Sequence, residues 1–254
     1  LPSLPDELKS LLPLYSSCIP ELGVGTSSYL DIQALQASIS GGVHAHISMR
    51  NQLENEQNID AYMILSGKAL YSNQSELAQL LKNTIESCRF DELDRIKELI
   101  QQIASHKEQS VTSQGHVLAM GVAVSKMSAI DALNYENSGM QGILNLKNMV
   151  KGFSDETLLS SYANKLKALH ELIIQGDKRL LCVAEENEKS ILINNLDELW
   201  EETSSSHKLK PFDMGVVREN VQTAWLFNTQ VNFCATAYPT VPAAHEDAAA
   251  LTVL

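Results

Sequence analysis

The chain has 254 residues, of which 44% are hydrophobic and 20% charged, so it can bury a full-sized core and is too apolar to be intrinsically disordered. Its 19 basic and 31 acidic residues give a formal charge of -12, which disfavours nucleic acid and anionic membranes as partners. No apolar stretch approaches the ~20 residues that cross a bilayer, and the absence of a CxxC pair argues against a zinc knuckle or a dense disulfide framework.

Both ends of the chain lack the usual terminal signals. Residues 1–7 contain no initiator Met, no basic region and no apolar core of a secretory signal. Residues 248–254 are an apolar, helix-favouring run without a capping residue. We therefore expect a segment cut from a longer polypeptide.

The first quarter of the chain predicts two helices and a hairpin. Apolar residues at helical spacing indicate a helix over residues 4–22, interrupted at Pro13 and Pro20. A second helix is expected over residues 26–40, capped by Thr26 or Ser27. From residue 43 the apolar period changes from helical to two, and it does so again over residues 59–66, which predicts two antiparallel strands.

Helices dominate the middle of the chain. They are expected over residues 75–87, 91–110, 112–126 as a continuation or bend, 129–135 and 139–149, and then from a Ser154 cap to about residue 173. Asp91 and Arg95 have the spacing of a helical ion pair. A short strand over residues 178–184 and a helix over 185–200 complete an α+β domain with a largely antiparallel sheet covered by helices.

A change of composition divides the chain into three parts. Residues 1–203 form the domain just described, and residues 204–228 have the Ser, His, Lys and Pro content of a connector. Residues 229–237 then alternate apolar and polar, which predicts a new strand, and a helix is expected to open at His245. Residues 229–254 therefore read as the truncated start of another domain.

The sequence offers no catalytic constellation. Phosphate-binding glycine loops, the GxSxG elbow and the HExxH and HxxEH zinc spacings are all absent. His44 and His46 project from the same face of the first predicted strand, but no third metal ligand can be named, so a solvated or chamber-lining role is favoured. We predict no catalytic, cofactor-binding or metal-binding residue in this segment. The four cysteines lie in apolar contexts and are expected to be buried free thiols: Cys18, Cys88, Cys182 and Cys234.

Several short phrases resemble one protein family across nearly the whole chain. The opening resembles the third domain of metallopeptidases of the presequence-protease type, in the insulinase and pitrilysin superfamily, and residues 229–239 are similar to the start of the fourth domain. The phrases are singly weak and jointly specific: Leu11-Leu12-Pro13-Leu14-Tyr15, Glu21-Leu22-Gly23, Gly41-Gly42-Val43, Leu65-Ser66-Gly67-Lys68-Ala69-Leu70, Arg89-Phe90-Asp91-Glu92-Leu93, Ser113-Gln114-Gly115-His116, Ala119-Met120, Thr229-Gln230-Val231-Asn232-Phe233 and Ala237-Tyr238-Pro239.

The resemblance implies a fragment of a zinc-dependent endopeptidase that degrades unfolded peptides in a closed chamber. In that family an HxxEH helix of the first domain binds the zinc, and the third domain is an inactive copy. This segment would be a structural, non-catalytic part of the chamber, with the rest of its own polypeptide as partner and His44 and His46 facing the chamber. The implied compartment is the cytoplasm in a bacterium or an organelle matrix in a eukaryote.

Two further points stay open at the level of sequence. A stand-alone, inactive peptidase-like scaffold that binds partners through its sheet is the alternative to a peptidase fragment. The resemblance also places a strand before Leu1, whose slot in the sheet would be empty here, and residues 229–238 are a candidate to fill it.

Overall fold

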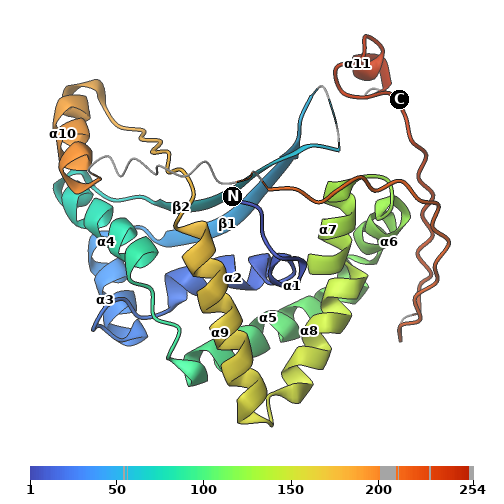
Figure 1. The fold of residues 1–254 in the computed structure, drawn as a ribbon, viewed down its shortest axis with the longest axis horizontal. Coiled ribbons are helices and arrows are strands. Elements are labelled where there is room, and N and C mark those ends of the chain that lie inside the picture. Colours follow the sequence, from blue (N-terminus) through green and yellow to red (C-terminus); the bar gives the residue numbers. More distant parts are fainter. Residues whose placement is uncertain (54, 56, 201–209, 211, 229, 252–254) are drawn as a thin grey trace.

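The computed structural model describes residues 1–53, 55, 57–200, 210, 212–228 and 230–251. Figure 1 shows a β-hairpin lying along one side of the helices, with α3, α4 and α10 at one end and α6, α7 and α8 at the other. No helix among these residues is long and apolar enough to span a membrane. The elements are α1 Asp6–Lys9, α2 Leu12–Cys18, η1 Ile19–Glu21, α3 Tyr29–Ile39, β1 Val43–Asn51, β2 Ile59–Gly67, η2 Tyr71–Asn73, α4 Gln74–Glu86, α5 Leu93–Ser113, α6 Gly115–Val124, α7 Ala129–Asn137, α8 Met140–Gly152, α9 Glu156–Ile173, η3 Glu186–Glu188, α10 Lys189–Leu199 and α11 Ala248–Leu251.

The hairpin confirms the alternation of the sequence. β1 pairs antiparallel with β2 in a register that sets Val43 opposite Gly67 and Asn51 opposite Ile59. Odd-numbered residues of β1 face the helices and even-numbered ones face away, because successive side chains of a strand point to opposite sides. The α+β class is therefore confirmed, and the sheet of the described residues contains these two strands.

The core is built around α2, which contacts β1, α5 and α9. Leu12, Tyr15 and Cys18 from α2 are at most 1% exposed, and Ile96 and Leu166 reach them from α5 and α9. Pro13 falls in the first turn of α2, where a missing amide hydrogen breaks no helical bond. The expected interruption at this proline is a chain break between two short helices, α1 and α2.

Three local expectations are wrong, each because an element begins a few residues from its expected start. Ser28, and not Thr26 or Ser27, caps α3, where it forms a capping box with Asp31. Asp155, and not Ser154, caps α9 by accepting from the Thr157 amide.

The expected Asp91–Arg95 pair is also absent. Because α5 begins at Leu93, Asp91 lies outside the helix and binds Arg89 instead, while Arg95 pairs with Glu21 and Glu98.

The two later strands are not formed. Residues 178–184 are extended but belong to no sheet, and Leu181 and Val183 are more than nine-tenths exposed. Residues 230–237 likewise form no strand, so the hypothesis that they fill a slot in the sheet is wrong, and the helix expected at His245 begins at Ala248. Alternation selects a strand only where a neighbouring strand supplies backbone hydrogen bonds.

The chain beyond residue 210 returns to the core. Phe212 is 4% exposed, its amide donates to the carbonyl of Leu1, and the ammonium of Lys9 lies 5.8 Å from its ring centroid. Further along, Val217 donates to Gln57 Oε1 and the amide of Glu219 donates to the carbonyl of Lys126. Residues 212–219, which lie inside the expected connector, therefore form a strap across the first unit. The division into residues 1–203, 204–228 and 229–254 stays a prediction, and residues 201–209 lie outside the described part.

Candidate functional site

A groove lies beside β1 and is the largest concave feature among the described residues. It encloses about 920 Å³ and is bordered by α2, β1, α7, α8 and α9. Its walls are mainly apolar, and asparagine and serine side chains lie among them. The apolar residues that line it include Leu12, Ala45, Ile47, Met49, Leu133, Ile143, Leu146, Met149 and Leu158.

The charged residues at this groove do not form a catalytic pair. Lys165 and Glu7 bind each other at 3.4 Å between Nζ and Oε2, and Lys107 and Glu136 are further lining residues. The α2 wall consists of leucine, proline and serine side chains, namely Leu12, Pro13, Ser16 and Ser17. None of these α2 side chains is the His or Glu that an HxxEH helix would present there.

His44 and His46 occupy the face of β1 that points away from the helices. Neither is buried, and of the two only His46 borders the groove. Tyr62 lies on the same face of β2, and the guanidinium of Arg179 covers its ring at 5.9 Å. Within the described ranges no three His, Cys, Asp or Glu side chains converge as metal ligands would. These residues therefore do not fit a zinc ion, and the chamber-facing role of the two histidines stays a prediction.

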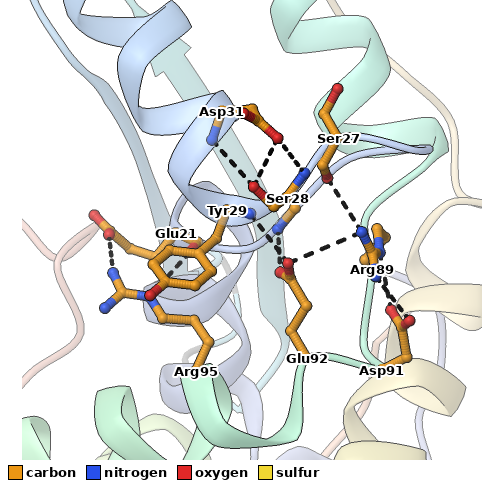
Figure 2. Close-up of polar contacts among 10 residues, drawn as sticks. Glu21, Ser27, Ser28, Tyr29, Asp31, Arg89, Asp91, Glu92 and Arg95 are labelled. Carbon is orange, nitrogen blue, oxygen red and sulfur yellow. Dashed lines mark hydrogen bonds and ion pairs between the residues drawn. The ribbon is translucent and has the colours of Figure 1, made fainter.

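A polar clamp, formed by Glu92 and the two loops it joins, fixes the entry to α3 (Figure 2). The Glu92 carboxylate accepts from the amides of Gly23 at 2.6 Å and Tyr29 at 3.0 Å. Its side chain is 12% exposed, and Arg89 lies 4.0 Å away. Gly23 is required at this point because an added Cβ would come within 2.5 Å of the Ser27 carbonyl oxygen. The clamp ties the loop before α3 to the start of α5.

Arg95 and Arg89 extend this clamp on either side. Arg95 binds Glu21 at 2.7 Å, and its guanidinium lies 4.7 Å from the ring centroid of Tyr29. Arg89 makes two hydrogen bonds to Asp91, at 3.0 and 2.9 Å, which lower the pKa of that carboxyl. The opposite charges are paired within the clamp, so its geometry indicates a structural role.

The buried titratable groups lie in the core and away from the groove. The Tyr15 hydroxyl hydrogen-bonds with His170 Nδ1 at 2.9 Å, and the ring of Phe90 lies 5.3 Å from that imidazole. Burial lowers the pKa of His170 and raises that of Tyr15.

The thiols divide into two kinds. Burial raises the pKa of Cys18 and of Cys88 to about 12, so neither is an activated nucleophile. Cys182 and Cys234 are exposed, which corrects the expectation that all four are buried. Both lie in the segments whose expected strands are not formed, so no sheet covers them.

Sequence reasoning missed both the groove and the clamp. The groove combines residues between positions 7 and 165, and Glu92 binds amides 69 and 63 residues away. No spacing pattern joins such distant positions. The available signal was indirect: the phrase Arg89-Phe90-Asp91-Glu92-Leu93 was part of the resemblance, without any indication of what Glu92 binds.

The comparisons with known proteins agree on one family. A family model for the region associated with peptidases of metallopeptidase family 16, subfamily C, matches residues 1–149. The mitochondrial presequence protease of Drosophila melanogaster is 24% identical over 258 residues, which cover 99% of this chain and 24% of that protein. The Saccharomyces cerevisiae enzyme is 23% identical over 99% of this chain, and the Danio rerio enzyme 29% over 65%.

The chain spans about a quarter of the length of the relatives that cover it almost completely. These matches agree with the order of elements in the structure, in which α2, α3 and the hairpin all fall inside the matched region. The chain belongs to the family of regions associated with peptidases of metallopeptidase family 16, subfamily C.

Proposed function

We propose that this chain is a non-catalytic segment of a zinc-dependent metalloendopeptidase that degrades unfolded peptides, and that it forms part of the wall of a closed peptide chamber. The observation that carries the proposal is the match to presequence proteases over 99% of the chain but only 24–26% of their length. The rest of the same polypeptide would then supply the catalytic machinery.

Two features of the described residues support a structural role for the segment. The α2 wall of the groove carries Leu12, Pro13, Ser16 and Ser17 and no zinc ligand. The Glu92 clamp and the buried contacts of α2 hold the helical layer to the hairpin. The hairpin face that carries His44 and His46 is the surface we assign to the chamber.

The compartment follows from the organism. The matched relatives are named as mitochondrial proteins, and we assign this chain to an organelle matrix in a eukaryote or to the cytoplasm in a bacterium.

An activity assay and the gene test the proposal together. The purified chain, supplied with zinc and an unfolded peptide, should show no chelator-sensitive cleavage, whereas the gene should encode an HxxEH region in the same open reading frame. Chelator-sensitive proteolysis with one bound zinc per chain would overturn the non-catalytic assignment. A start codon directly before Leu1 would overturn the fragment assignment and favour the stand-alone scaffold.

A further inference from the structure

The outer edge of β1 carries unused backbone hydrogen-bonding groups. In an antiparallel pair, residues alternate between those that bond to the partner strand and those whose N–H and C=O point outward. The Gln52 amide donates to the Asn58 carbonyl at 2.9 Å, which makes this a hydrogen-bonded pair. Counting back in the register, Ala45, Ile47 and Met49 direct their backbone groups away from β2.

The opposite edge of the hairpin supports this assignment. Ala61, which faces Met49 in the register, accepts a hydrogen bond from the ammonium group of Leu1 on the outer side of β2. The carbonyl of Ala61 therefore points outward, as the alternation requires for this pair. No described residue makes an equivalent bond to the outer edge of β1.

The groove runs beside this open edge. Ala45, His46, Ile47 and Met49 all line it, and α7 and α8 form the facing wall. Five strand residues, from 45 to 49, extend for roughly 16 Å at ~3.3 Å per residue. The edge also lacks the proline or lysine that commonly protects an exposed strand from pairing.

We propose that this groove binds an extended, uncharged peptide segment as an added strand on β1. An extended peptide supplies the alternating donors and acceptors that the edge residues require, and its apolar side chains would lie against Leu133, Leu146 and Met149. The facing wall leaves room for one strand and would obstruct the approach of a second hairpin. The Lys165–Glu7 pair at the rim is already neutralised, so the groove adds no strong preference for a charged segment.

This inference deepens the proposed function, because it names where this non-catalytic segment would hold an unfolded peptide. The site consists only of residues of this chain and involves no metal. Peptide binding can therefore be tested on the 254-residue chain separately from any cleavage. Loss of the proposed binding would leave the fragment assignment intact, and detection of cleavage would leave the binding result intact.

The test uses a synthetic probe and a matched control peptide. The probe is a fluorescein-labelled peptide of alternating Thr and Val with a Lys at each end, and the control has the same sequence with N-methyl groups on alternate amides. Fluorescence polarisation should show saturable binding of the probe, and the N-methylated peptide should bind at least about tenfold more weakly because one edge can no longer pair. Equal binding of the two peptides would overturn the proposal, since it would indicate apolar adhesion alone.

Hydrogen exchange and two variants locate the site. The probe should slow amide exchange at Ala45, Ile47 and Met49, and protection elsewhere without these three would overturn the proposal. Ala45→Pro removes an outward amide without removing a β1–β2 bond, so it should weaken binding about tenfold; Ser48→Ala, on the other face, should leave binding unchanged. If Ala45→Pro fails to fold, the exchange pattern of the unaltered chain still decides. A dimer held by β1 edges, seen by sedimentation, would assign the edge to a second copy and overturn the proposal.

Discussion

Removing the Glu92 carboxylate should destabilise the fold more than any other single change in the polar clamp. In Glu92→Ala the amides of Gly23 and Tyr29 lose their acceptor. A hydrogen bond to a charged group contributes about 1.5–3 kcal/mol, and the lower end applies to a side chain near the surface, so two such bonds amount to about 3 kcal/mol. At roughly 2–4 °C per kcal/mol for a chain of this size, Tm should fall by about 6–12 °C.

Two further variants separate the carboxylate from its surroundings. Glu92→Gln keeps one acceptor oxygen but turns an NH₂ group toward the second amide, so its loss of stability should be smaller than that of Glu92→Ala. Asp91→Asn is the matched control, because Asp91 is 70% exposed and binds only Arg89 among the clamp residues, and its effect should stay within about 0.5 kcal/mol. Thermal and urea unfolding followed by circular dichroism measure all three.

The result that would refute this reasoning is equal stability of Glu92→Ala and Asp91→Asn. It would mean that water replaces the carboxylate at both amides without cost. A lower Tm together with a reduced urea m-value would instead indicate local unfolding of the loop before α3, which is a different consequence of the same lost bonds.

Three other outcomes are expected from the structure. Burial holds the pKa of His170 below its usual 6.5, so the unfolded chain binds the proton more readily; stability should be complete above about pH 6.5 and fall as the pH drops below it, and His170→Gln should flatten that dependence in urea midpoints. Phe212→Ala should cost about 3 kcal/mol in urea unfolding, because the buried ring anchors the strap, whereas Phe227→Ala, at 48% exposure, should have little effect. A thiol reagent should modify Cys182 and Cys234 rapidly and the buried Cys18 only after unfolding; a Cys18 that reacts as fast as Cys182 would contradict the burial described above.

The local order of elements could be predicted from the sequence because it depends on periodicity. The alternation of residues 43–49 and 59–65 predicted a hairpin, and the observed register, in which Ile47 faces Met63, keeps the apolar residues of both strands on one face. The amphipathic runs predicted α4, α5 and α9, with boundaries that differ by a few residues. Caps were less predictable, since Ser27, Ser28 and Thr26 have similar capping ability and the helix start depends on where Glu92 binds the chain.

The pattern of residues 229–237 shows the limit of such reasoning. Alternation describes which side chains could share a buried face, but a strand also needs backbone partners, and these come from another part of a fold. The same limit applies to the phenylalanine of the strap and the lysine it contacts: nothing in the spacing of Lys9 and Phe212 predicts their contact across 203 positions.

The sequence by itself determined the class of fold, the hairpin and the family, because periodicity and short phrases are local properties of the chain. Only the tertiary structure decided where the groove lies, which edge of β1 is open and what Glu92 holds in place. These features depend on distances between residues far apart in sequence. Such distances are set by how α2, α7 and α8 pack against the hairpin, and packing is a property of the whole core.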